Sequence, residues 1–233
     1  MNLFFEPGIN QGVRFLDEAE SFHAVKVLRR KRGDHIRITD GKGSFYDAVI
    51  TNADTRRCTF DIVEQHEEPA PGYAIHIAIS PTKNADRIEW FVEKAVEIGV
   101  TEISLIDCDH TERRHQKTDR LEKVTLSAMK QSLKARLPVV NPLRPLRDFM
   151  STVTADQKFI AYVDNDNQEL LKNVITPRSA YVVLIGPEGD FSKEELTLAE
   201  QNGFQKVSLG PSRLRTETAG IVACHILNLA NTH

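Results

Sequence analysis

Two segments of the sequence place glycine and proline directly before charged and hydroxyl side chains. The first is GPEGDF, residues 186–191, and the second is LGPSRLRTET, residues 209–218. Glycines such as Gly186 and Gly189 can adopt backbone angles that are closed to other residues and let a ligand approach the main chain, while Pro187 stiffens the turn. Each segment is therefore a candidate ligand-binding loop, although GPEGDF also suits an ordinary connection between a strand and a helix.

Neither segment carries a phosphate-binding motif. They do not match GxGxxG, and the chain has no GxxxxGK[ST], so a dinucleotide fold or a P-loop is not supported. A nucleoside without phosphates fits better, held by main-chain groups and by leucines that form apolar walls. The candidate ligand-binding residues are Leu184, Gly186, Pro187, Glu188, Gly189, Leu209, Gly210 and Leu214.

The elements that must position these loops alternate between apolar strands and amphipathic helices. Strands are expected at 73–80, 102–108, 158–164, 181–187 and 206–210, and helices at 85–99, 117–133, 192–203 and 216–230. Such alternation predicts an α/β fold with a largely parallel sheet, in which ligands bind beyond the carboxyl ends of the strands. Ser192 and Glu195 form a capping-box pattern, and Gly203 ends that helix. Residues 141–156 show no pattern that predicts an element.

The first part of the chain has a different pattern of residues, in which short β-type runs dominate. β-type runs occur at 35–40, 44–50 and 57–65. One helix is expected at 17–29, with apolar residues such as Phe22 and Val27 close to helical spacing. These elements predict a small barrel that carries one helix. The prolines and glycine of EEPAPGY are typical of a boundary, so we expect domains at 1–70 and 71–233.

Composition excludes several classes of protein. With 233 residues and a net charge of -3, the chain is a globular protein that does not coat nucleic acid through its overall field, although local basic patches remain possible. Its three cysteines have no CxxC spacing, which supports neither a disulfide framework nor a zinc ribbon. The N-terminus resembles no signal peptide and no apolar run would span a bilayer, so we expect a cytoplasmic protein without a membrane or metal partner.

Residues 23–37 form the most basic stretch, with six lysines or arginines against one aspartate. Such a cluster can bind phosphates locally, although a solvated charged turn is the alternative. Further bases follow in TERRHQKTDR, which suggests a discontinuous cationic surface across both domains. The candidate RNA-binding residues are His23, Lys26, Arg29, Arg30, Lys31, Arg32 and Arg113.

The segments IGPEGDFSKEEL and SLGPSRLRTETAGIVA resemble the two signature segments of the RsmE family, the small-subunit ribosomal RNA uridine-N3 methyltransferases of the SPOUT superfamily. HAVKVLRRKRGD resembles the N-terminal motif of that family, KNADRIEWFVEKAVEIGV its first catalytic-domain helix, and TERR its next loop. The resemblance thus extends over nearly the whole chain. It implies an N-terminal PUA-like β-barrel, a C-terminal SPOUT-type α/β trefoil knot, S-adenosylmethionine as methyl donor, 16S ribosomal RNA as substrate, and a homodimer.

The sequence departs from the family pattern at two places. Leu133 and Lys134 stand where the family usually has glycine and arginine after QS, and Ser212 and Arg213 stand where arginine and an aliphatic residue are common. These departures concern contacts with RNA more than recognition of the methyl donor.

The resemblance also suggests roles for the polar residues that open the last helix. Methyl transfer to a uridine ring nitrogen requires alignment, and removal of the nitrogen's proton or stabilisation of the resulting anion. Arg215 would hold the developing oxyanion on a uracil carbonyl, and Glu217 or Thr218 would orient or accept the proton. For Glu217 the alternative is the ordinary preference of carboxylates for a first helical turn.

Other functions stay open at this point. An RNA-binding dimeric adaptor would use the α/β domain without catalysis, a ribose 2'-O methyltransferase of the same superfamily would use a similar donor site, and a small-molecule enzyme would use GPEG as an anion site. His23 and His110 lack nearby partners in sequence, and we do not expect either to act in catalysis. Trp90, Phe91 and Val92 are expected in the core rather than stacked on a base.

Overall fold

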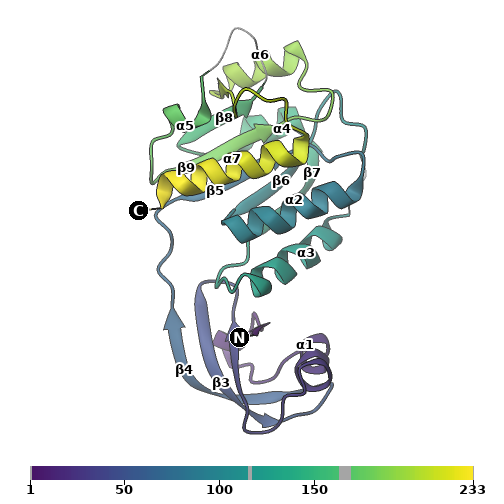
Figure 1. Ribbon diagram of the computed structural model, residues 1–233, viewed down its shortest axis with the longest axis vertical. Coiled ribbons are helices and arrows are strands. Elements are labelled where there is room, and N and C mark those ends of the chain that lie inside the picture. The colour runs from purple at the N-terminus through teal and green to yellow at the C-terminus, as the bar shows by residue number, and fades with distance from the viewer. Residues whose placement is uncertain (1, 115–116, 163–168, 233) are drawn as a thin grey trace. The chain divides into compact units, whose positions relative to one another are not determined.

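The structure, a computed structural model, describes residues 2–114, 117–162 and 169–232 (Figure 1). It divides into two compact units. The smaller unit comprises Met1–Ala70 with Leu126–Leu137, and the larger unit comprises Pro71–Thr125 with Pro138–His233. No helix within the described ranges has the length and apolar character that a membrane crossing requires.

A four-stranded sheet forms the smaller unit. Its strands, in spatial order, are β1 (Leu3–Phe5), β2 (His35–Thr39), β3 (Ser44–Asn52) and β4 (Thr59–Glu67). β1 runs parallel to β2, and the other neighbours are antiparallel. A 3-10 turn, η1 (Ile9–Gln11), follows β1. Ile38, Tyr46 and Phe60 are buried in one cluster of side chains, as expected for strands that turn one face towards a core. The β-rich fold predicted for this part of the chain is confirmed.

The helix predicted at 17–29 is short and irregular. It consists of α1 (Glu18–Phe22), which continues into a π-helical turn, η2 (His23–Val27). Phe22 and Val27 lie in this helical segment as predicted, but they are 54% and 57% exposed and so do not pack into the core. Ala24, Val25 and Leu28 pack against the core, and the buried Ser21 hydroxyl also holds the helix, because it donates to Leu16 O and accepts from Cys58 N–H.

The smaller unit also takes in part of a later helix, α3 (Thr118–Gln131), and the turn that follows it. Lys130 forms an ion pair with Glu20 of α1. Arg136 donates to the carbonyl oxygens of Lys42 (2.6 Å) and Glu68 (2.8 Å). Residues of this segment are far from 1–70 in sequence, which is why its membership of the smaller unit was not expected.

Six parallel strands form the sheet of the larger unit. They are β5 (Ala74–Ile79), β6 (Glu102–Asp107), β7 (Val139–Pro145), β8 (Gln157–Ala161), β9 (Ala180–Ile185) and β10 (Gln205–Val207). Their order across the sheet is β10-β8-β9-β5-β6-β7, and every neighbouring pair is parallel. The predicted α/β fold with a parallel sheet is confirmed.

Helices cover both faces of this sheet. α2 (Ala85–Ile98) and α7 (Thr216–Asn231) lie side by side over one face (Figure 1). On the other face, α4 (Leu146–Thr152) and α6 (Lys193–Gln201) pack against Val182 and Leu184 of β9. The short α5 (Leu171–Val174) contacts α7. Because successive residues of a strand point to opposite faces, β9 supplies both layers of core.

Two details of the helices test the sequence analysis directly. The capping box of Ser192 and Glu195 is present at the start of α6, and Gly203 after its end has φ +81°. On α2, Phe91 is fully buried as predicted, but Trp90 is 45% exposed, so its assignment to the core is wrong. Consecutive helical residues point about 100° apart, so the three residues from Trp90 to Val92 cannot all face one core.

The thiols of the chain are all enclosed. Cys58 lies in the smaller unit, and Cys108 and Cys224 lie in the larger unit. Each is free of a disulfide and is buried. Burial raises the pKa of Cys58 and Cys108, which makes a reactive thiolate unfavourable at either position.

Candidate active site

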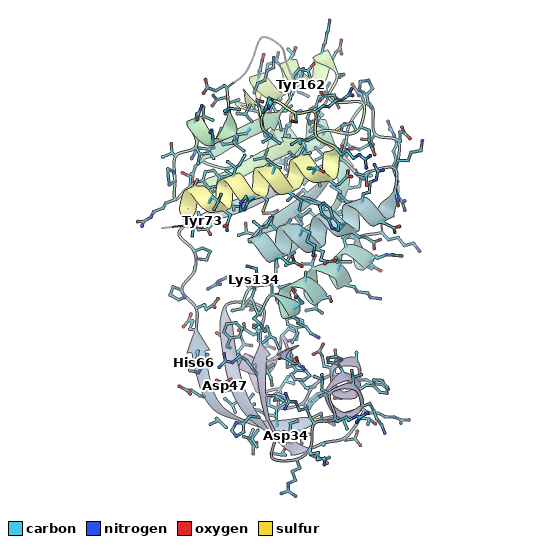
Figure 2. All side chains as sticks on the ribbon, viewed as in Figure 1. Asp34, Asp47, His66, Tyr73, Lys134 and Tyr162 are labelled. Atoms are coloured by element: carbon cyan, nitrogen blue, oxygen red, sulfur yellow. The ribbon has the colours of Figure 1, made fainter. Side chains whose placement is uncertain are left out.

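A cavity of about 490 Å³ lies at the carboxyl ends of β8, β9 and β10. Tyr162, directly after β8, lines it, as do residues 185–188 from the end of β9 and residues 208–210 after β10. Residues 212–216 and Ala219, from the segment that leads into α7 and the first turns of that helix, line it as well, and Ala161 and Asp190 complete the lining. Tyr162, which is labelled in Figure 2, marks this cavity in the larger unit. We call this space the donor cavity.

The donor cavity brings together most of the residues predicted to bind a ligand. Those that line it are Gly186, Pro187, Glu188, Leu209, Gly210 and Leu214. Leu184 does not, because it is fully buried among the side chains of α4 and α6. Gly189 does not line it either. The expectation that the two glycine-bearing strand ends converge on one site therefore agrees with the geometry.

The glycines of GPEGDF are needed for a different reason from the one expected. Neither Gly186 nor Gly189 has a positive φ, and the left-handed residue of this turn is Asp190, with φ +62°. A Cβ at Gly186 would lie 3.0 Å from the ring of Phe191, and a Cβ at Gly189 would lie 3.0 Å from Cβ of His110. Close packing, rather than backbone angle, requires glycine at these two positions.

Neighbouring segments hold the GPEGDF loop in place. His110 donates from Nδ1 to the carbonyl oxygen of Asp190 at 2.8 Å, and this bond is the main cause that raises the pKa of His110. Lys83 N–H donates to the Glu188 carboxylate at 3.0 Å. Asp109 accepts from the Ser192 hydroxyl at 2.6 Å. His110 thus supports the loop.

The cavity contains both signs of charge. Burial raises the pKa of the Asp190 carboxyl, while the positive charge of Arg213 opposes that rise. Both residues line the donor cavity. A partly enclosed carboxylate and a guanidinium are the kind of sparse polar groups that orient a small molecule in an otherwise apolar site.

A second cavity, of about 630 Å³, adjoins the first. Its lining residues come from α2 and from the segment that leads into α7, namely Asp86, Arg87, Trp90, Arg213, Leu214, Arg215, Glu217 and Thr218. Residues 213–215 line both cavities. All three predicted catalytic residues, Arg215, Glu217 and Thr218, therefore lie at this second cavity, and Arg215 also borders the first.

Glu217 has an unusual environment. It is only 6% exposed, although it is a charged residue in the first turn of α7. Its Oε1 lies 3.8 Å from Nε of Arg87, and its Oε2 has no hydrogen-bond partner among the described residues. An unpaired buried carboxylate oxygen costs free energy. The preference of carboxylates for the first turn of a helix does not account for that cost.

Sequence reasoning missed several residues at these cavities. Tyr162 lies inside the strand predicted at 158–164, but the observed β8 ends at Ala161, and ligands bind beyond strand ends. Asp86, Arg87 and Trp90 gave no such signal, because only the packing of α2 beside α7 brings them to the site.

The basic residues predicted to bind RNA lie in both units. Lys26, Arg29, Lys31 and Arg32 are exposed, whereas His23 and Arg30 are half-buried. The His23 ring packs edge-on against Phe4 with 6.3 Å between centroids, so it has a structural contact. Arg113 belongs to the larger unit and is half-buried. RNA binding by these residues stays a prediction.

The departures from the family pattern also have positions in the structure. Leu133 has φ +55°, a left-handed conformation that suits glycine, and Lys134 follows it (Figure 2). Ser212 and Arg213 are exposed and line the donor cavity. The departure at Leu133 thus concerns backbone conformation, and the departure at Ser212 and Arg213 changes the lining of the donor cavity.

One cluster in the described residues has the spacing of metal ligands. Oxygen and nitrogen atoms of Asp47, Glu64 and His66 lie within 4.8 Å of one another. Figure 2 shows Asp47 and His66 near each other in the smaller unit. Arg37 donates to both oxygens of Asp47, at 2.7 and 2.6 Å, and thereby lowers the pKa of that carboxyl. The cluster is therefore an ion-pair network between strands, in which the Arg37 guanidinium binds the carboxylate that a metal cation would otherwise bind.

Comparison with known proteins gives consistent results. Residues 68–228 match a family model described as an RNA methyltransferase domain, and residues 16–63 match an RNA methyltransferase PUA domain. A crystal structure of a probable rRNA-methyltransferase from Porphyromonas gingivalis is 43% identical, with a TM-score of 0.93 over 99% of this chain and 98% of that one.

Two further relatives carry a more specific description. The structure of a ribosomal RNA small subunit methyltransferase E from Neisseria gonorrhoeae, bound to S-adenosyl methionine, is 27% identical, with a TM-score of 0.87 over 99% of this chain and 98% of that one. A protein from Aquifex aeolicus described as ribosomal RNA small subunit methyltransferase E is 28% identical over 97% of this chain and 99% of its own length.

Proposed function

Because the chain belongs to the RNA methyltransferase family, and within it to the RsmE family, we propose that it transfers a methyl group from S-adenosylmethionine to N3 of a uridine in 16S ribosomal RNA. The observation that carries this proposal is the donor cavity, in which the glycine-bearing ends of β9 and β10 meet beside Arg215. A cavity of this kind beyond parallel strands is where an α/β fold binds a nucleoside.

The residues of the donor cavity suit S-adenosylmethionine. Its volume of about 490 Å³ falls within the range of roughly 300–1,000 Å³ found for small-molecule sites. At Gly210, where φ is +131°, a Cβ would meet no atom within 4 Å, so the main chain is open to a ligand. Leu209 and Leu214 would form apolar walls, and Asp190 would favour a positively charged molecule. When bound, S-adenosylmethionine supplies a methyl group activated by a sulfonium.

The polar residues at the second cavity have distinct roles in this proposal. Arg215 precedes α7 and is exposed, so its guanidinium is free to approach a uracil carbonyl oxygen that gains negative charge. Glu217 accepts or directs the proton of the ring nitrogen through its carboxylate. Thr218, half-buried beside it, orients the base through its hydroxyl.

The rest of the chain would bind the RNA and assemble the enzyme. The PUA domain, with the exposed bases Lys26, Arg29, Lys31 and Arg32, would contact phosphates next to the target. The target uridine must be unpaired or turned out, since pairing hides its N3 edge. A homodimer, a trefoil knot and a cytoplasmic location are what the family implies, and sedimentation of the purified protein tests the first.

The decisive experiment uses small ribosomal subunits from cells that lack the gene. The subunits are incubated with the protein and S-adenosylmethionine, and their RNA is digested to nucleosides that are resolved by chromatography and mass spectrometry. We expect 3-methyluridine to appear among these nucleosides. The isomer 2'-O-methyluridine would identify a ribose methyltransferase instead.

Calorimetry with S-adenosylmethionine separates the remaining alternatives. Binding at the donor cavity is expected of a methyltransferase. A folded protein that binds RNA but neither the donor nor its product would be an adaptor. A protein whose activity is indifferent to RNA would be a small-molecule enzyme.

A further inference from the structure

The second cavity is placed to hold the acceptor of the methyl group. Residues 213–215 line both cavities, so one short segment separates them. Methyl transfer requires that donor and acceptor be held in line and in contact. If the donor cavity binds the methyl donor, the acceptor must therefore approach from a space that adjoins it, and the second cavity is such a space.

Trp90 gives this cavity an aromatic wall. Its indole is 45% exposed, although the next residue, Phe91, is fully buried and fixes the orientation of α2. Asp86 and Arg87, one helical turn earlier, line the cavity with it, as expected for residues three and four positions apart on one helix face. A single exposed aromatic residue is ordinary in itself. An indole in a cavity with charged walls is the arrangement on which unpaired bases stack.

The second, independent observation is the unpaired carboxylate oxygen. Glu217 is 6% exposed, lines the cavity, and leaves Oε2 without a partner among the described protein groups. A ligand with an N–H donor would pair this oxygen. Uracil carries such a donor at N3, whereas cytosine presents a lone pair there, which an ionised carboxylate repels.

We propose that the second cavity binds the target uracil, turned out of the RNA, with its ring stacked on Trp90 and its N3–H directed at the Glu217 carboxylate. This inference rests on the proposed function and assigns its acceptor site. Trp90 is then a positioning residue that presents the base, and Glu217 selects uracil over cytosine.

The first test compares substitutions of Trp90 by Ala, Phe and Leu. The readouts are kcat and KM for small subunits, the dissociation constant of S-adenosylmethionine, and the sedimentation of the protein. We expect Trp90→Ala to lower kcat/KM by roughly 10- to 100-fold, mainly through KM for subunits, because base stacking is lost. Trp90→Phe retains most of the activity, and Trp90→Leu behaves like Trp90→Ala. Donor affinity and sedimentation stay as in the native protein.

Leu229→Ala is the matched control. Leu229 is 55% exposed and lies on α7, which packs beside α2, but it does not line the cavity. We expect this variant to match the native protein in every readout. Native activity in Trp90→Ala, or full rescue by Trp90→Leu, would contradict stacking. If Trp90→Ala and Leu229→Ala both shifted sedimentation to a smaller species, Trp90 would instead cover a contact between two copies of the chain.

A second test does not depend on methyl transfer. Trp90 is the single tryptophan of the chain, so intrinsic tryptophan fluorescence reports on this cavity alone. We expect uridine 5'-monophosphate to quench it more strongly than cytidine 5'-monophosphate does, and Glu217→Gln to reduce that difference. Equal quenching by both nucleotides, or by neither, would overturn the assignment. Absence of methylation by the native protein with selective quenching retained would refute the proposed reaction but not the base site.

Discussion

At the scale of single residues, Glu217 is a position where chemistry and stability conflict. Its carboxylate is nearly inaccessible to water, and the described protein groups pair only one of its oxygens, at 3.8 Å from Arg87. The first turn of a helix does not need such an arrangement, because an exposed carboxylate serves it equally well. The conflict favours a role in the reaction.

The substitution Glu217→Gln tests that role. It keeps the size of the side chain and removes its charge and its ability to accept a proton. We expect the rate of methyl transfer at saturating substrates to fall by about 10²- to 10⁴-fold, the usual contribution of a general base. Affinity for S-adenosylmethionine should stay unchanged in calorimetry. Glu194→Gln, at an exposed carboxylate in the first turn of α6, is the control. A Glu217→Gln enzyme with the native rate would exclude proton transfer by this residue.

Sequence reasoning reached the site at some residues and failed at others for identifiable reasons. Gly186 and Gly210 were expected at one cavity, and they are there because the strands of a parallel sheet, here β9 and β10 on either side of β8, end at the same edge. Leu184 was expected as a wall, but strand alternation turns it into the core beneath α4 and α6. Trp90 was assigned to the core that α2 covers, because an apolar triplet does not reveal which member points outwards.

At the scale of elements, the end of α3 carries a conformational cost. Leu133 N–H donates to Lys130 O, and Lys134 N–H donates to Met129 O, which is the Schellman pattern with Leu133 in the position that favours glycine. Its φ of +55° brings Cβ close to the backbone. The side chain is 46% exposed and so recovers little by packing.

We therefore expect Leu133→Gly to stabilise the protein. Relief of the left-handed strain, about 1–2 kcal/mol, exceeds the extra entropy that glycine loses on folding, about 0.5–1 kcal/mol. Urea denaturation should show a net gain of up to about 1 kcal/mol in the free energy of unfolding. Leu133→Ala keeps Cβ and should bring no such gain. A loss of stability in the glycine variant would mean that the leucine side chain packs better than its exposure indicates.

The contact between α2 and α7 depends on a glycine for another reason. A Cβ at Gly220 would lie 2.5 Å from Cε2 of Phe91 and 3.1 Å from Cδ1 of Ile79. Both neighbours are fully buried and have no free space to move into. Gly220 thus allows α7 to approach α2 and the sheet closely, and this approach brings the residues of α2 to the second cavity.

Substitution of Gly220 by alanine should destabilise the larger unit. Alanine favours a helix by about 1 kcal/mol over glycine, but overpacking of a core costs about 1–3 kcal/mol, so the steric term wins. Thermal unfolding should shift to lower temperature, and Phe91→Leu in the same chain should restore part of the loss. Gly72→Ala, where a Cβ would meet nothing within 4 Å, is the control and should be nearly neutral.

Elements that the sequence did not predict share a physical cause. β7 has prolines at positions 142 and 145 and lies at the edge of the sheet, where a strand tolerates proline and needs no alternating pattern. α4 has only two turns, too few for a clear period. In η2 the turn widens to i→i+5 hydrogen bonds, which a period of 3.6 residues cannot anticipate.

At the scale of the whole molecule, RNA must be bound by a protein whose net charge is -3. Local basic residues have to provide the attraction. In a plot of log affinity against log salt concentration, each phosphate contact adds roughly 0.7 to 0.9 to the magnitude of the slope. The double substitution Lys26→Ala and Arg32→Ala should flatten this slope by about 1 to 2 for small subunits. Calorimetry should show unchanged affinity for S-adenosylmethionine.

Removal of Arg147 and Lys172 provides the comparison for that measurement. Both are exposed bases of the larger unit, on α4 and α5, and neither belongs to the predicted RNA-binding set. Their replacement by alanine changes net charge by the same amount and should leave the slope as it is. If both double variants flattened the slope equally, RNA would respond to total charge rather than to the basic stretch at 23–37.

The three buried cysteines allow the opening of each unit to be measured separately. An excess of a thiol-specific reagent reacts with Cys58 only when the smaller unit opens, and with Cys108 or Cys224 only when the larger unit opens. Labelling rates followed by peptide mass spectrometry therefore distinguish cooperative unfolding of the entire chain from independent opening of either unit, and no engineered probe is required.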